Sequence, residues 1–405
     1  MEEMRKLTIG AGLLAIAALF WMARTTSTDF LSTGQGKAGP QAAWISKQWS
    51  AKVAVDALTQ STEKLELNLA DQYSLTAHRS QAFSRDDGTL VWYGSLSEAG
   101  QAAPTAGMLA AAMNGIVLVL SNGQVSGSLR WNGQVFRLLP ASDGYVLEQV
   151  DGAKLPPDHA SDDAPMASAS QATRKPQPHE PGHATVRVLI VGTKNAGEAH
   201  EDLQALAHLA IEESNQTYLN SGIDMSLELA AFRQLDYEQH SSSPDIDLRR
   251  LVAPADGFMD DVHQMRDELK ADVVVLLVDT IMEACGRASA RPATADTAFA
   301  YVNLKCVGVW RFTTAHEIAH LQGASHEYFD DDDGPFVHGH GFIHEPENEP
   351  GWRTVMATVE AANSVRVPFW SDPERLMDGV PMGDARTANN RRLLEETKWT
   401  VAGFR

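Results

Sequence analysis

Cysteine is nearly absent from this chain of 405 residues, which contains only Cys285 and Cys306. Two cysteines exclude a disulfide-rich scaffold and a structural metal site built from cysteines, although they allow one bridge. Basic residues are also scarce, since 33 Lys and Arg stand against 53 Asp and Glu and leave a net charge of −20. So acidic a surface repels phosphate backbones, and we expect no nucleic-acid partner. The remaining composition, 43% hydrophobic and 21% charged, is that of a globular protein, and the length predicts two or three domains.

One long apolar run lies near the N-terminus. Arg5 and Lys6 precede residues 7–23, which carry no charge and end at Arg24. The run is long for the core of a secretory signal and short for a spanning helix, and no clear cleavage site follows it. We expect residues 1–27 to be a cleaved signal peptide or an uncleaved membrane anchor rather than a buried core helix. Either would make the rest of the chain secreted or periplasmic, with membrane contact only through this segment.

The region from 28 to 154 is typical of a small β-rich domain. Asn122-Gly123 and Asn132-Gly133 each separate apolar runs, and this pattern predicts hairpins because both turn residues must take positive φ. No cluster of potential catalytic side chains occurs in this region. Residues 155–183 are rich in Pro, Ser, Ala and Asp without an apolar period, which predicts an exposed linker where proteolysis concentrates.

Strand and helix patterns alternate from residue 184 to the C-terminus at 405. Residues 186–191 and 272–278 are apolar runs of strand length, and apolar residues recur at helical spacing within 200–219. A β-α-β succession of this kind predicts a mixed or parallel sheet covered by helices.

The stretch HEIAHLQGASH, residues 316–326, carries the chemistry. On a helix, His316 and His320 lie on one face about one turn apart, so both imidazoles can bind one metal ion. Glu317 follows the first of these ligands, where its carboxylate can reach a water molecule at the metal. Gly323 permits a sharp turn through positive φ, which returns His326 as a third ligand. Three neutral nitrogens with one open position are typical of catalytic zinc.

This stretch resembles the extended zinc signature HExxHxxGxxH of the metzincin metalloendopeptidases. The sequence WRTVMA at 352–357 resembles their methionine turn, which implies that Met356 forms an apolar floor beneath the imidazoles rather than binding zinc. Together with ACGRAS, HGHGF and PFWSDPE, most of 184–405 resembles the bacterial peptidyl-Asp metalloendopeptidases, a reprolysin-like branch. The resemblance implies an α+β or α/β catalytic domain with a twisted mixed sheet, an active-site helix, the methionine turn and a C-terminal helix.

The same resemblance implies a peptide hydrolase with one catalytic zinc ion, Glu317 as general base and proteins or peptides as substrates. It also implies a zymogen in which residues 28–154 form an inhibitory prodomain, and a preference for cutting before Asp. Arg353 and Arg366, two cations near the turn, could recognise such an acidic side chain or could be ordinary surface arginines. The alternative is a catalytically silent binding or sensor module on the same fold, although the intact general base argues against it.

Two positions depart from the family pattern. Some metzincins carry a Tyr two residues after the turn methionine, whereas this chain has Thr358. Some zymogens are held latent by a prodomain cysteine on zinc, but no cysteine precedes Cys285 here. Latency therefore requires steric blockage or an Asp or His ligand.

Three other features have a simpler explanation beside the functional one. Cys285 and Cys306 flank a segment expected at the edge of the cleft, where a bridge would brace it; the alternative is two free buried thiols. The acidic run at 330–333 could hold calcium, but it lacks the ligand spacing of an EF-hand and we expect a solvated loop. His338, His340 and His344 could form a second metal site, but no second i, i+4 pair occurs among them.

Overall fold

The computed structural model describes residues 28–36, 42–69, 73–104, 107–158, 181–200, 202–241, 243–280, 284–329, 334–348, 350–358 and 364–405. Three predicted features lie outside these residues: the N-terminal signal or anchor, most of the linker, and the acidic run at 330–333. Among the helices that the structure describes, none is both long enough and apolar enough to cross a membrane.

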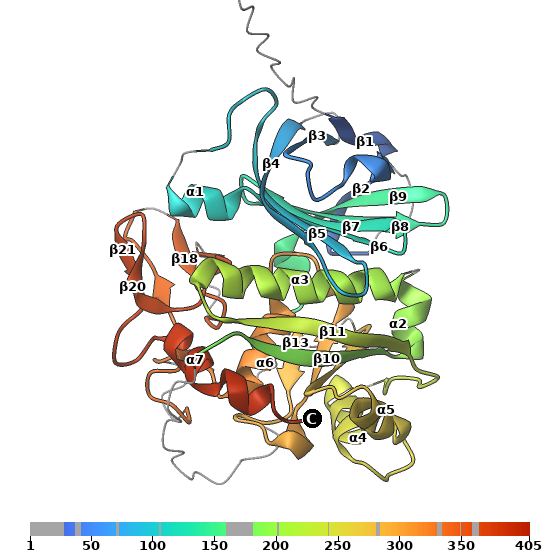
Figure 1. Ribbon diagram of the computed structural model, residues 1–405, viewed down its shortest axis with the longest axis vertical. Helices are drawn as coiled ribbons and strands as arrows, with labels where there is room; N and C mark the ends of the chain where they lie inside the picture. Colours follow the sequence, from blue (N-terminus) through green and yellow to red (C-terminus); the bar gives the residue numbers. More distant parts are fainter. Residues whose placement is uncertain are drawn as a thin grey trace, which may run out of the picture.

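The N-terminal strands close into a barrel in the order β1-β2-β9-β8-β7-β6-β5-β4-β3, in which β1 and β3 pair in parallel (Figure 1). Its strands are β1 (Thr28–Gly36), β2 (Ile45–Val53), β3 (Lys64–Leu69), β4 (Tyr73–Ser84), β5 (Leu90–Glu98), β6 (Gly115–Ser121), β7 (Gln124–Trp131), β8 (Gln134–Ala141) and β9 (Gly144–Val150), and helix α1 (Met108–Met113) lies between β5 and β6. The β-rich N-terminal region is thus confirmed. Both predicted Asn-Gly turns have positive φ at each residue, and they join β6 to β7 and β7 to β8.

The second part of the chain is built on a sheet in the order β11-β10-β12-β14-β13. All neighbours pair in parallel except β13, which is an antiparallel edge strand. The strands are β10 (Ala184–Gly192), β11 (Met225–Gln234), β12 (Val273–Val278), β13 (Gly286–Ala288) and β14 (Phe299–Asn303). The central strand β12 is buried throughout, because its alternate residues enter two different cores, one on each face of the sheet.

Helices cover both faces of this sheet. Residues of α3 and α6 share a core with one set of strand residues, whereas those of α4 and α5 share a core with the other set. The helices are α2 (Lys194–Ala199), α3 (Leu203–Ser221), α4 (Pro244–Val252), α5 (Asp261–Glu268), α6 (Thr313–Gln322) and α7 (Asn390–Val401). The short strands that follow α6 are β15 (Ser325–Glu327), β16 (His340–Gly341), β17 (Ile343–His344), β18 (Gly351–Arg353), β19 (Ser364–Arg366), β20 (Asp372–Met377) and β21 (Val380–Met382).

Helix α3 lies between the barrel and the sheet (Figure 1). Its apolar stripe packs on the sheet, but its opposite face is also buried and carries Glu212 and Glu213. Arg85 of the barrel donates two hydrogen bonds to Glu212, of 3.0 and 2.8 Å, and Ser128 donates one of 2.7 Å to Glu213. The contact between the two parts of the chain is therefore rich in ion pairs and hydrogen bonds.

Candidate metal centre and its surroundings

Helix α6 brings the predicted histidines together. His316 and His320 lie one turn apart on this buried helix, and it ends at Gly323, whose φ of 106° is in the left-handed region. The amide of Gly323 donates to the carbonyl of His320, and Ala324 donates to Ala319, which closes the C-terminal turn. The chain then reverses into β15, which carries His326.

The three imidazoles present nitrogen atoms within 4.8 Å of one another. Their geometry fits a metal ion. Zinc–nitrogen bonds of about 2.0–2.1 Å in a tetrahedral site place the ligand atoms roughly 3.3 Å apart. The Nε2 atoms of His320 and His326 are 3.0 Å apart.

Two backbone carbonyls orient these rings. Nδ1 of His316 lies 2.9 Å from the carbonyl oxygen of Val355, and Nδ1 of His320 lies 2.8 Å from that of Ala324. Because a carbonyl only accepts, each Nδ1 carries the proton, which leaves the lone pair on Nε2. Burial, reinforced by the neighbouring histidines, lowers the pKa of both His316 and His320 well below the usual value. Both rings are therefore neutral near pH 7 and suited to binding a cation.

Glu317 is fully buried beneath the edge strand β13. At Gly286, the first residue of this strand, a β-carbon would lie 2.6 Å from Oε1 of Glu317, closer than such contacts occur in proteins. Glycine at 286 therefore makes room for the carboxylate. This close approach places Glu317 between the helix that carries two of the histidines and the strand at the edge of the sheet.

The segment around Met356 closes against the first histidine. Met356 is completely buried and follows Val355, whose carbonyl binds His316. The amide of Ala357 donates to the carbonyl of Thr354 at 3.1 Å, so the chain turns at the methionine.

Glu327, which the sequence reasoning missed, holds the next residue after this turn. The amide of Thr358 donates to Oε2 of Glu327 at 2.8 Å, and its hydroxyl lies 3.3 Å from Oε1. Glu327 is buried and directly follows His326. Its carboxylate thus ties the third histidine's strand to the segment after Met356.

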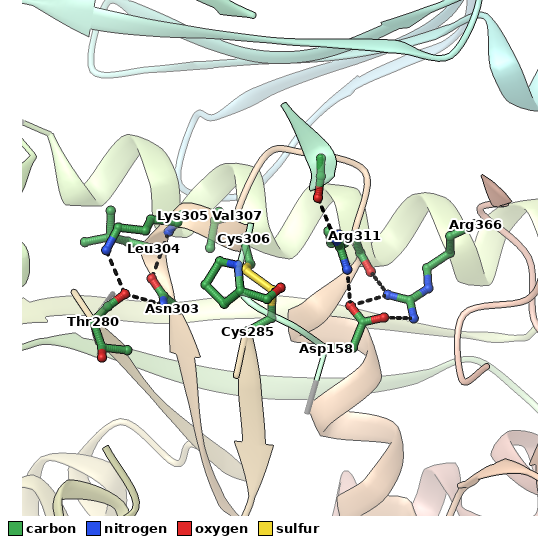
Figure 2. The surroundings of a disulfide bond; sticks show 12 residues. Asp158, Thr280, Cys285, Asn303, Leu304, Lys305, Cys306, Val307, Arg311 and Arg366 are labelled. Carbon is green, nitrogen blue, oxygen red and sulfur yellow. Dashed lines mark hydrogen bonds and ion pairs between the residues drawn. A yellow bond between two sulfur atoms is a disulfide. The ribbon is translucent and has the colours of Figure 1, made fainter. Parts of the chain in front are cut away.

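A disulfide joins Cys285 to Cys306 at the start of the edge strand (Figure 2). Cys285 directly precedes β13, and Cys306 ends the short turn after β14, the strand that pairs with β13. The bond therefore ties the edge strand to its neighbour beside Glu317.

The prediction of an exposed linker is wrong for its first residues. Leu155, Pro156 and Asp158 are buried. Leu155 packs in an apolar cluster, and Asp158 forms ion pairs with Arg311 at 2.7 Å and with Arg366 at 2.6 Å (Figure 2). Burial alone would raise the pKa of Asp158, but Arg366 and Arg311 outweigh it and hold the pKa well below its usual range. Arg366, one of the two predicted arginines, is thus buried rather than on the surface.

The other predicted arginine and the three further histidines lie in different surroundings. Arg353 is buried and donates a hydrogen bond of 2.6 Å to the carbonyl of Ser364. His338 pairs with Glu396 at 3.1 Å, and His344 packs on a tryptophan ring. In the part of the chain that the structure describes, these histidines and His340 do not form a second group of converging metal ligands.

Comparisons with known proteins match this region and most of the chain. Residues 182–367 match the model of metallo-peptidase family M12. A peptidyl-Asp metalloendopeptidase of Stenotrophomonas maltophilia strain K279a is 38% identical over 364 residues, covering 87% of this chain and 86% of that protein. One from Xanthomonas campestris pv. campestris is 35% identical, with 87% and 85% covered. Among solved structures, metalloproteinase-II from Bacteroides fragilis is 12% identical with a TM-score of 0.42, covering 78% of this chain and 91% of that one.

Proposed function

Because this chain belongs to the peptidyl-Asp metalloendopeptidase family and is a metalloendopeptidase, we propose that it hydrolyses proteins or peptides with one zinc ion and with Glu317 as general base. The observation that carries the proposal is the convergence of three imidazoles, two of them oriented by backbone carbonyls, beside a buried carboxylate. His316, His320 and His326 would hold the ion, and Gly323 provides the turn that returns the third of them. A bound zinc ion supplies Lewis-acid polarisation of the scissile carbonyl and lowers the pKa of a water molecule.

Glu317 moves the proton in this mechanism. Its carboxylate accepts a proton from the attacking water and later donates it to the nitrogen of the departing amine. The backbone at Gly286 lies close to the Glu317 carboxylate and restricts its position. Such a restriction favours proton transfer in one geometry. Met356 would support the imidazoles from below, as the metzincin turn does, and the Cys285–Cys306 bond would brace the edge of the cleft.

We further propose a proenzyme organisation with a preference for cutting before Asp. Residues 28–154 would be the inhibitory prodomain, 155–183 the connection where processing occurs, and 184–405 the protease domain. The preference is supported by the name of the relatives. Residues 1–27 would direct the chain out of the cytoplasm, as a signal peptide or an anchor. A catalytically silent binding module remains the alternative, and the buried general base argues against it.

The test is hydrolysis of a quenched peptide library by the purified full-length chain and its processed form. We expect cleavage that a zinc chelator abolishes and added zinc restores, with cuts before Asp. Glu317→Gln is the matched control, because it keeps the shape of the side chain and the metal ligands but cannot accept the proton. A processed, zinc-loaded chain that cuts nothing would favour the silent module instead.

A further inference from the structure

We propose that Arg311 and Arg366 form the subsite that recognises an acidic side chain of the substrate, and that Asp158 occupies this subsite in the full-length chain. The proposal rests on the proposed peptidase function and names the residues that would set its specificity. In this proposal, the segment that follows the barrel lies where a substrate would bind.

The contacts of Asp158 are typical of a specific binding site for a carboxylate. Both of its oxygens are bonded: Oδ1 accepts from Arg311 at 2.7 Å and from Arg366 at 3.1 Å, and Oδ2 accepts from Arg366 at 2.6 Å. The two nitrogens of Arg366 thus grip the carboxylate in a bidentate fork, the strongest and most directional pairing for this group. All three side chains are buried. Two arginines thus bind one carboxylate, and both ion pairs are lost when this carboxylate leaves.

The arginines lie beside the catalytic groups. Arg311 precedes α6 by two residues. Arg366 donates 2.7 Å and 3.0 Å hydrogen bonds to the carbonyl oxygens of Ala357 and Arg311, which connect the turn after Met356 to the approach of the active-site helix. The subsite is therefore built from the same two segments that hold the first histidine.

The main chain before Asp158 contacts Cys285, the residue that directly precedes the edge strand β13. The amide of Cys285 donates a 2.7 Å hydrogen bond to the carbonyl of Pro157, and the carbonyl oxygen of Pro156 lies 3.4 Å from Sγ of Cys285. The next residue, Gly286, is the one that covers Glu317. An extended chain that bonds to a sheet edge while a side chain enters a pocket is a standard mode of peptide recognition. Residues 156–158 thus lie against the start of the strand that covers Glu317, where the proposal places the substrate.

Charge explains why this subsite selects an acid. Removal of Asp158 takes from Arg311 and Arg366 an ion-pair partner that a neutral side chain does not replace, whereas an incoming Asp would restore both ion pairs. Loss of one partner of a buried, hydrogen-bonded charge pair is strongly unfavourable. We therefore expect an Asp peptide to be bound or cleaved roughly 100-fold better than a neutral one. A peptide with Asn at the same position has the same shape and lacks only the charge.

The first arm of the test measures specificity. The ratio of kcat/KM for an Asp peptide over its Asn twin is determined for processed wild type, Arg311→Gln and Arg366→Lys. Arg366→Lys keeps the positive charge but loses the bidentate pairing. It can therefore be used even if a variant with a neutral residue at this buried site does not fold. We expect the ratio to fall at least tenfold in both variants, mainly through the Asp peptide. Arg391→Gln, a variant of a half-exposed arginine at α7, is the matched control and keeps the ratio.

The second arm measures docking without relying on activity. Hydrogen exchange of the peptide containing Cys285 is compared in the full-length chain with Asp158→Asn and with Asp151→Asn, a control in the exposed pair Asp151–Lys154. We expect exchange to accelerate about tenfold or more only in Asp158→Asn, because the Cys285 amide then loses its acceptor Pro157.

The outcomes separate the two proposals. Wild type that cuts neither peptide contradicts the proposed function, while the exchange experiment still tests the docking. Cleavage with an unchanged Asp-to-Asn ratio in both arginine variants overturns the specificity subsite. Unchanged exchange in Asp158→Asn overturns the occupation of the subsite in the full-length chain.

Discussion

The substitution Gly286→Ala tests the position of Glu317, the proposed general base, separately from the binding of the metal. The added methyl group would lie 2.6 Å from Oε1, 2.8 Å from Cγ and 2.9 Å from Cδ of Glu317. Because all three atoms are too close, rotation of the carboxylate alone does not relieve the overlap. Ordinary contact between such atoms requires about 3.5 Å, so either the glutamate or the strand must move by roughly 1 Å.

A displacement of this size predicts a loss of about 100-fold in kcat/KM, because proton transfer depends on placement of the base. The three histidines and their carbonyl partners are untouched, so we expect an unchanged zinc content. The assay is hydrolysis of an Asp peptide by the processed chain, with zinc measured on the same sample. Arg391→Gln, at a partly exposed side chain of α7, is the control in the same processed chain. Activity of Gly286→Ala within about threefold of wild type would refute the placement of Glu317 as general base.

Three other predictions concern the same region. Glu317→Ala should retain zinc and lower kcat by about 10²–10⁴, the usual contribution of a general base, as measured by metal analysis and peptide hydrolysis; near-normal turnover would exclude this role. Replacing Cys285 and Cys306 by Ser removes a cross-link spanning a sequence separation of 21 and should lower the free energy of unfolding by about 3 kcal/mol in denaturant titrations; an unchanged midpoint would show that the bond adds no stability. The pKa of Asp158 is depressed in the folded chain, so its stabilising effect is complete above the unfolded value of about 3.9 and is lost only as pH falls through the lower folded pKa. Hydrogen exchange at Cys285 should then be equally protected at pH 7 and pH 5 after correction for intrinsic rates, and a loss of protection in this interval would contradict the ion pairs.

Local sequence patterns were sufficient to predict the structure where neighbouring residues determine the backbone geometry. The i, i+4 spacing of His316 and His320 and the glycine at 323 predict a turn that the structure contains, because a helix period and a left-handed residue act over only a few positions. The Asn-Gly hairpins follow from the same kind of short-range constraint. In both cases a few neighbouring residues restrict the backbone, so the local conformation can be predicted without knowledge of distant contacts.

Long-range contacts could not be predicted in this way. Asp158 stands in a polar, proline-rich stretch that is typical of linkers, and its partners Arg311 and Arg366 are 153 and 208 residues away. Glu212 and Glu213 occupy the side of α3 opposite its apolar stripe, a position that normally faces solvent. No periodicity shows that a barrel from the preceding region covers them. Both cases have one cause: a buried polar group has the same sequence pattern as an exposed one until its partner is known.

The polar face of α3 bears on how the barrel, as the proposed prodomain, could dock firmly and still be removed. Glu213 accepts hydrogen bonds from Ser128 of the barrel and from the amides of Gly308 and Trp310, so part of its hydrogen bonding persists when the barrel leaves. Burial raises the pKa of Glu213, and water admitted on release would favour its charged form. In the same way, Glu212 would lose its hydrogen bonds to Arg85 when the barrel leaves and would be hydrated by water instead. Departure of the barrel therefore uncovers carboxylates that hydrate readily, in contrast to an interface made wholly of apolar side chains. Together with the proposed binding of Asp158 by Arg311 and Arg366, such an interface would suit an inhibitor that binds tightly while covalently attached and separates after cleavage.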